Sequence, residues 1–132
     1  MGRTTEIERL ELRAPASPGA VPGMRRAVVD FAELHGVGVP PDVALAVSEA
    51  ITNAVLHAYR DDSAGPVRVV ACAEPDRLVV VVRDYGCGMS PHPDSPGLGL
   101  GLAVIGRLAT EVNIERPDAG GGTRLRMCFA NT

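Results

Sequence analysis

The sequence predicts an α+β two-layer sandwich, in which a mixed, mostly antiparallel sheet carries helices on one face. Strand-like and helix-like patterns follow one another in the order β α α β β α β β. The run Leu78–Val82 is apolar at every position, as in a central strand that is covered on at least one face. Short turn-forming segments separate neighbouring strands. A length of 132 residues predicts one domain, residues 1–132.

The N-terminal half of the chain predicts one strand and two helices. Apolar and charged residues alternate over Glu6–Arg13, which predicts a strand with one solvated face. Ser17-Pro18 suits the N-cap and first position of a helix that runs to Leu34, with Pro22 near its first turns. Apolar residues then recur at helical spacing over Asp42–Ala58, the strongest helix in the sequence.

The C-terminal half is richer in strands. Val67–Ala73 and Leu78–Asp84 flank Glu74-Pro75-Asp76-Arg77, an arrangement that predicts a β-hairpin. Leu100–Ala109 predicts a short helix opened by glycines. Alternating apolar residues predict two further strands, over Glu111–Glu115 and Thr123–Phe129.

Composition narrows the classes of function. Two Phe, two Tyr and no Trp offer few platforms for base stacking, and the net charge is −3, so nucleic acid is disfavoured as a partner. No apolar stretch reaches the length of a membrane span, and the N-terminus lacks the apolar segment of a secretory signal. Three cysteines without a C-x-x-C pair fit reduced thiols. We therefore expect a cytoplasmic protein.

The chain contains no Lys, because all 13 of its basic residues are Arg. A Walker A nucleotide site needs a Lys on the phosphates, and a eukaryotic-type protein kinase needs one on its third strand. Both designs are excluded, so a nucleotide would have to be held in another way.

Four polar or glycine-rich motifs stand out from the predicted elements. Glu49, Asn53 and His57 follow one another at i, i+4 and i+8 and therefore share one helix face. Asp84-Tyr-Gly86-Cys-Gly88 follows the central strand, where a carboxylate could accept a hydrogen bond from a ligand amine. Taken alone, the first motif is better explained as a solvated helix face, and the second also fits a simple exit from a strand into a turn.

The other two motifs are rich in glycine. Gly97-Leu-Gly99-Leu-Gly101-Leu102 leads into a helix whose free N–H groups suit a phosphate, although a flexible hinge explains it equally well. It lacks the spacing of a Rossmann fingerprint. Gly120-Gly-Gly-Thr123, taken alone, is an ordinary hairpin turn.

Together and in this order, the four motifs resemble the signature of the GHKL ATP-binding superfamily, whose domains have the histidine kinase/Hsp90-like (Bergerat) fold. Glu49–His57 resembles its N-box, Asp84–Gly88 its D-x-G-x-G box, Gly97–Leu102 its glycine-rich box and Gly122-Thr123 its late G-T. The resemblance covers about Ser17 to Phe129. Within this superfamily, the small size of the chain and its β-α-α start make it similar to the anti-sigma factor serine/threonine kinases of bacteria.

The resemblance implies roles for the matching residues. It implies that Asn53 ligates Mg²⁺, that Glu49 is the general base, and that Asp84, supported by Thr123, accepts from the adenine amine of ATP. Gly86 and Gly88 would line the base and ribose. Gly97, Gly99, Gly101 and Leu102 would lie at the phosphates. His57 is better explained by packing than by chemistry, and Cys87 receives no role.

One departure from the family pattern bears on catalysis. No Arg lies between Arg83 and Arg107, so the short, proline-rich segment Met89–Pro96 offers no cation to the γ-phosphate. Arg107, which we place two turns into the predicted helix, is the nearest candidate.

The resemblance leads to a main hypothesis and two alternatives. The main hypothesis is an anti-sigma factor that phosphorylates an anti-anti-sigma (STAS-type) partner and sequesters a sigma factor. The alternatives are a nucleotide-gated binding protein without phosphotransfer and a detached histidine-kinase catalytic domain. A homodimer is implied by the resemblance alone.

Overall fold

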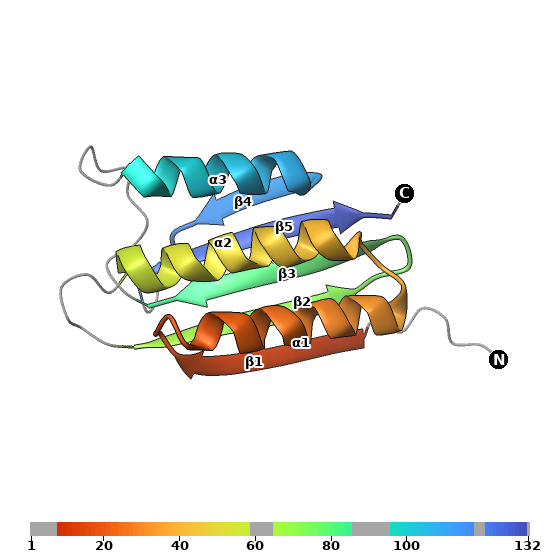
Figure 1. Cartoon of the computed structure of the whole chain (residues 1–132), viewed down its shortest axis with the longest axis horizontal. Helices are drawn as coiled ribbons and strands as arrows, with labels where there is room; N and C mark the ends of the chain where they lie inside the picture. Colours follow the sequence, from red (N-terminus) through yellow and green to blue (C-terminus); the bar gives the residue numbers. More distant parts are fainter. Residues whose placement is uncertain (1–7, 59–64, 86–95, 118–120, 132) are drawn as a thin grey trace.

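The computed structural model describes residues 8–58, 65–85, 96–117 and 121–131. Within these residues the elements follow the order β α α β β α β β that the sequence predicts (Figure 1). The strands are β1 (Glu8–Pro15), β2 (Pro66–Ala73), β3 (Arg77–Asp84), β4 (Glu111–Glu115) and β5 (Thr123–Ala130), and the helices are α1 (Ala20–His35), α2 (Pro40–Ala58) and α3 (Pro96–Leu108).

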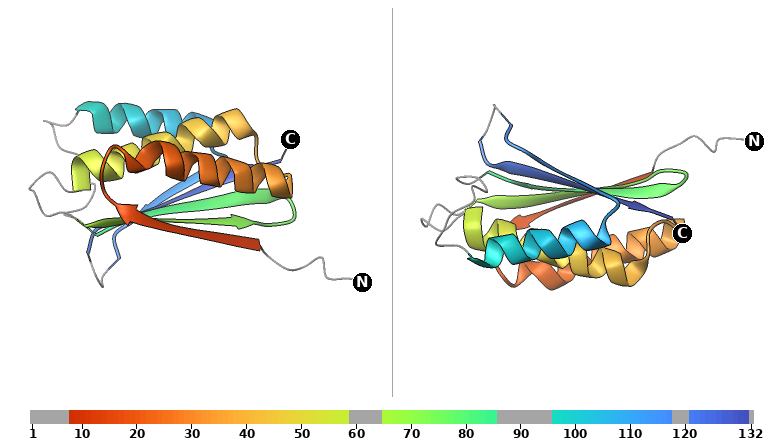
Figure 2. Two further views of the ribbon diagram at one scale, coloured as in Figure 1. Left: turned by 60° about the horizontal axis from the view of Figure 1, so that its bottom comes forward. Right: turned by 90° about the horizontal axis from the view of Figure 1, so that it is seen from above.

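The five strands form one sheet in the order β1-β2-β3-β5-β4. Each pairing among these strands is antiparallel, so the parallel component of the expected mixed sheet is absent from the described strands. Figure 2 shows all three helices against one face of the sheet, whereas no described element covers the other face. This arrangement confirms the predicted two layers, and β3 is the central strand.

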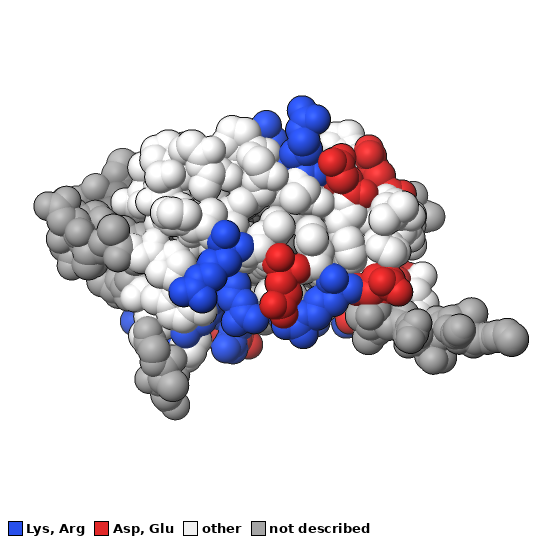
Figure 3. All heavy atoms as spheres, turned by 90° about the horizontal axis from the view of Figure 1, so that it is seen from below, with Lys and Arg blue, Asp and Glu red and all other residues white. Residues whose placement is uncertain are grey.

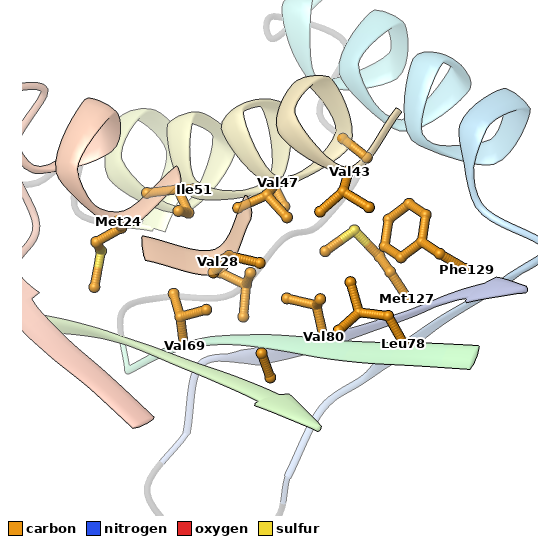
Figure 4. Close-up of a cluster of buried hydrophobic side chains, with 14 of the residues drawn as sticks. Met24, Val28, Val43, Val47, Ile51, Val69, Leu78, Val80, Met127 and Phe129 are labelled. Atoms are coloured by element: carbon orange, nitrogen blue, oxygen red, sulfur yellow. The ribbon is translucent and has the colours of Figure 1, made fainter. Parts of the chain in front are cut away.

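The core lies between the helices and the covered face of the sheet. Strand residues alternate between the two faces, so one side chain in two points toward the helices. In Figure 4, Val69 and Val80 rise from the sheet toward Val28 of α1 and toward Val47 and Ile51 of α2. All five side chains are fully buried. The apolar stripe of α2 and the period-2 pattern of the strands therefore build the same core.

Several element boundaries differ from the prediction by one to four residues, and three of these differences have a local physical reason. β1 continues to Pro15, because proline is compatible with an edge strand. α1 begins at Ala20 with Gly19 as its N-cap, and the expected cap from Ser17 is not formed. α3 begins at Pro96 rather than Leu100, since the first N–H groups of a helix need no partner and proline suits that position.

The hairpin between β2 and β3 forms where the sequence predicts it. The N–H of Glu74 donates to the carbonyl oxygen of Arg77 at 2.9 Å, and the Arg77 Nε lies 2.8 Å from the Glu74 carboxylate. The pairing continues along both strands from Ala73–Leu78 to Val67–Asp84. This register fixes which side chains share each face of the sheet.

Two of the three cysteines lie in the described residues, and both are free thiols. Burial raises the pKa of the Cys128 thiol, so this group stays neutral and unreactive at ordinary pH. Among the described helices, none has the length and apolar character to cross a membrane.

Replacing a buried α2 side chain tests the assignment of the core. Ile51 is fully buried, so Ile51→Ala should lower the free energy of unfolding by about 2–5 kcal/mol. Leu56 lies on the same helix but is 56% exposed, so Leu56→Ala should change it by no more than about 0.5 kcal/mol. Urea denaturation of both variants provides the measurement, and equal losses would contradict the packing of α2.

Candidate functional site

The segments that carry the four motifs meet at one end of the molecule. α2 ends there at Ala58, β3 ends at Asp84, α3 begins at Pro96 and β5 begins at Thr123 (Figures 1 and 2). α2 packs against α3 and against β3, which brings these ends together. The topology thus gathers motifs that are up to about half a chain apart in the sequence.

Asn53 contributes a buried amide on α2. Its side chain is only 4% exposed, and its Nδ2 has no hydrogen-bond partner among the described residues. A buried donor without a partner costs about 1–3 kcal/mol of desolvation. Ala50 and Ala54, its neighbours on α2, are fully buried. Alanine side chains carry no hydrogen-bonding group, so these two neighbours cannot serve as partners of the amide. The Nδ2 of Asn53 is therefore available to a hydrogen-bond acceptor that the described residues do not provide.

Glu49 lies one helical turn before Asn53 on the same helix. Its side chain is half-buried, and among the described residues no cation lies within salt-bridge distance of its carboxylate. The i, i+4 spacing places both side chains on one face of α2. His57 continues the spacing, but its side chain lies outside the described residues. The predicted stripe is thus confirmed for its first two members.

Asp84 and Thr123 form a buried polar pair at the end of the sheet. They are directly opposite each other in the register of β3 and β5, and their exposed fractions are 1% and 0%. Alternation along both strands places them on the face that the helices cover. Burying a carboxylate is unfavourable unless polar groups surround it, so this pair marks a polar end to an otherwise apolar core.

Gly122 allows the backbone to approach Asp84 closely. It has a φ of +78°, and a Cβ at this position would lie 2.1 Å from the carbonyl oxygen of Asp84. No other residue fits without displacing the strand, because that distance is far below van der Waals contact. The sequence indicated a hairpin turn here and, through the family resemblance, a late G-T motif. It did not predict this contact, since the contact joins segments that are remote in the sequence.

Arg83 connects backbone segments at this end of the molecule, and the sequence analysis gave it no role. Its Nη1 donates to the carbonyl oxygens of Asp84 at 2.9 Å and Gly121 at 2.8 Å. Its guanidinium lies 4.3 Å from the ring centroid of Tyr85. These contacts connect the end of β3 to the turn before β5. Its position next to Asp84 was the one available clue in the sequence.

The glycine-rich motifs are only partly described. Gly97, Gly99 and Gly101 lie in the first turns of α3 rather than before it, and Leu102 follows half-buried. Gly86 and Gly88 lie outside the described residues. The first four N–H groups of a helix lack intrahelical partners, so the start of α3 presents N–H groups that favour an anion at this end of the molecule.

The predicted position of Arg107, two turns into its helix, is wrong. It lies in the last turn of α3 and is exposed, not two turns into the helix. At 1.5 Å per residue, its Cα is about 15 Å along the helix axis from that of Gly97. Arg107 therefore lies at the end of α3 that is remote from the four motifs.

Comparison with known families identifies this arrangement. Residues 14–129 match the family described as the histidine kinase-like ATPase domain. The chain belongs to this family. Membership of the histidine kinase-like ATPase family implies the use of ATP, and the converging motifs occupy the matched region. Among the described residues, no group of three or more His, Cys, Asp or Glu side chains gathers as a metal site.

Relatives within the histidine kinase-like ATPase family are bacterial regulators. The serine-protein kinase RsbW of Bacillus licheniformis is 33% identical over 123 residues, which cover 80% of this chain and 77% of the relative. RsbW of Bacillus subtilis is 32% identical over the same shares of each chain. The anti-sigma F factor of Clostridium acetobutylicum is 34% identical over 97 residues, 65% of this chain and 66% of the relative.

Substituting two glycines tests the close approach at Asp84. Gly122→Ala should lower the free energy of unfolding by at least about 1–2 kcal/mol, because alanine is strained at positive φ and its Cβ displaces the Asp84 carbonyl. Gly106→Ala should raise it by about 0.5–1 kcal/mol, because this helical glycine has open space around it. Chemical denaturation gives both values, and changes of the same sign would refute the close approach.

Proposed function

We propose that this chain is an anti-sigma factor with ATP-dependent serine/threonine protein kinase activity. It sequesters a sigma factor and phosphorylates an anti-anti-sigma partner of the STAS type, as a cytoplasmic bacterial regulator. The proposal is supported by the names of its relatives, serine-protein kinase RsbW and anti-sigma F factor. The observation that carries the proposal is the buried amide of Asn53, whose Nδ2 has no partner among the described residues. Asn53 lies on α2, whose C-terminal end lies with the ends of β3, β5 and α3 (Figure 1). The free thiols of Cys72 and Cys128 suit a reducing compartment.

The residues at this end fit ATP with Mg²⁺. An asparagine oxygen is a hard ligand that suits Mg²⁺ and adds no negative charge beside phosphates. The amide nitrogen of the same side chain is buried without a partner, so a bound phosphate or metal-held water would satisfy it. Mg²⁺ normally keeps few protein ligands and takes the others from phosphates and water, so a larger cluster of protein ligands is not required.

The nucleotide would lie with its base at the sheet and its phosphates at α3. Asp84 would accept from the adenine amine, with Thr123 supporting it from the opposite strand. Gly86 and Gly88 would line the base and ribose. The phosphates would lie against the first turns of α3, at Gly97, Gly99, Gly101 and Leu102, where free N–H groups and the positive helix end favour anions.

Glu49 is the proposed general base. It is half-buried and lies one turn from Asn53, so it would meet a hydroxyl that approaches the metal-bound phosphate. Glu49 removes the proton of the partner's serine or threonine hydroxyl, while the new bond forms between that oxygen and the γ-phosphorus. The bond from phosphorus to the leaving oxygen of ADP breaks in the same step. Mg²⁺ supplies charge neutralisation at the phosphates.

A second candidate function is favoured by the position of Arg107. Phosphoryl transfer requires neutralisation of charge at the γ-phosphate, and the nearest arginine after Arg83 lies at the far end of α3. A chain that binds ATP without transferring phosphate would act as a nucleotide-gated binding protein. The experiment on Glu49 below separates the two functions.

The role of Asp84 is tested by an isosteric change. Asp84→Asn should leave the melting temperature without ligand near that of the wild type and remove the rise that Mg-ATP produces. The reason is that an amide donor then faces the adenine amine, and the charged acceptor is lost. Differential scanning calorimetry with and without Mg-ATP measures both effects. A variant that fails to fold would identify Asp84 as a structural residue instead.

The role of Glu49 is tested by phosphate transfer. Glu49→Gln should keep the affinity for Mg-ATP and lower the rate of transfer to a co-encoded anti-anti-sigma partner by about 10²–10⁴-fold, because a positioned base is lost. Glu33→Gln, at an exposed position on α1, is the control that should keep the wild-type rate. Radiolabelled ATP provides the measurement. Nucleotide-dependent partner binding by a wild type that transfers no phosphate would favour the second function.

A further inference from the structure

Four arginines lie in one row across the uncovered face of the sheet. The registers place Arg13 opposite Arg68, Arg68 opposite Arg83, and Arg83 opposite Arg124, on four adjacent strands. Directly opposite residues present their side chains on the same face of a sheet. These four residues are called the arginine row below. At about 4.8 Å between strands, the row spans about 14 Å.

The arginine row lies on a face that is basic as a whole. The same register and alternation add Arg9, Arg77 and Arg126 to this face, against Glu11, Glu111 and Glu115. Arginine is therefore in excess on this face, although the chain carries a net charge of −3. Figure 3 views the molecule from the β1 edge of the sheet and shows basic side chains in a band along that edge, with acidic ones between and beside them.

The described acidic residues of this face contact Arg68 and Arg124 of the arginine row, so their two charges offset part of the four positive charges. Glu11 lies 3.5 Å from Arg68 and also contacts Arg9, and Glu115 lies 2.8 Å from Arg124. The arginine row places like charges directly opposite one another on three successive strand pairs, which is unfavourable for the sheet. The core lies on the other face, so burial does not explain the row as a whole, although Arg83 also holds the end of β3 to the turn before β5. A binding role explains why like charges lie together here.

The surface beside the arginine row is hollowed. A depression of about 230 Å³ is lined by Arg68, Arg83 and Arg124, with Val70 and Val81 on the same two central strands. The side chains of Arg68 and Arg124 are each 43% exposed, so their guanidinium groups are accessible. An apolar floor with arginines around it suits an amphipathic partner whose carboxylates meet the guanidinium groups.

We propose that the arginine row binds an acidic helix of a partner protein, lying across the strands. Carboxylates at i, i+4, i+7 and i+11 of a helix form a stripe with one step per turn, about 5.4 Å. That step is close to the roughly 4.8 Å between adjacent strands, so each carboxylate can meet one arginine of the row. The inference does not depend on nucleotide use, because the side chain of Asp84 lies on the opposite face of the sheet.

Other occupants fit this surface less well. A nucleic acid would place its long polyanionic backbone beside Glu11 and Glu115, which flank the arginine row, and beside a chain of negative net charge. A second copy of this chain in a symmetric dimer would oppose one basic face to another. A helix with an acidic stripe meets neither difficulty.

Peptide binding to the full chain tests the proposal. The probe is a fluorescein-labelled, alanine-rich helical peptide of about 20 residues with Glu at i, i+4, i+7 and i+11. It should bind at least about tenfold more tightly than a peptide with Gln at those positions, because each Glu supplies a charge-assisted bond. It should also bind more tightly than an isomer with the four Glu spread around the helix. Binding should weaken strongly near 1 M salt, where the Debye length is about 3 Å.

Two charge-matched double variants locate the site. Arg13→Gln with Arg68→Gln should weaken binding of the acidic peptide by at least about tenfold. Arg26→Gln with Arg107→Gln, at exposed positions on α1 and α3, removes the same charge and should leave binding within about twofold. Fluorescence anisotropy measures the affinities, and the peptide comparison stands even if a variant fails to fold.

Several outcomes would overturn the proposal. Equal affinity for the striped and spread peptides would contradict the match between helix turns and strand spacing. Equal losses of affinity in the two double variants would show that the arginine row is not the binding site. Binding of an oligonucleotide that depends on the arginine row, without peptide binding, would assign the surface to nucleic acid. A dimer that only the Arg13 and Arg68 double variant dissociates would assign it to a second copy of this chain.

Discussion

The close approach of Gly122 to the backbone of Asp84 is the constraint on which the site depends. A Cβ at residue 122 would lie 2.1 Å from the Asp84 carbonyl oxygen, so the chain can enter β5 at this point only through glycine. That entry sets the register in which Asp84 faces Thr123. A shift by one residue would turn Thr123 and every following side chain of β5 to the other face. The buried polar pair and the core beneath it are therefore consequences of one backbone contact.

The same alternation gives the sheet two chemically different faces. Side chains of one parity, such as Val69, Val80 and Leu125, build the core beneath the helices. Side chains of the other parity include the arginine row, which lies in the open. Arg83 connects the two surfaces, because it belongs to the row and also donates to the carbonyl oxygens of Asp84 and Gly121. A sheet covered on one side can in this way carry a nucleotide site and a partner surface back to back.

Sequence patterns predicted the features that arise within one element. The i, i+4 spacing of Glu49 and Asn53 depends only on the helix, and the alternation in β2 and β5 depends only on the strand. The start of α3 was placed too late, because glycine and proline have low helix propensity but are acceptable in a first turn. The arginine row and the Gly122 contact could not be predicted, since each depends on the register between strands.

The position of Arg107 determines where the positive charge at the proposed phosphate site must come from. The start of a helix contributes the equivalent of about half an elementary charge, far less than a triphosphate carries. Arg107 lies at the other end of α3, and Arg83 and Arg124 present their side chains on the uncovered face of the sheet, away from the side chain of Asp84. Asn53 is neutral and, under the proposed function, would bind the metal without cancelling its charge. Under the proposed function, the divalent ion therefore supplies most of the neutralisation, and the neutral amide of Asn53 preserves its full effect on the phosphates.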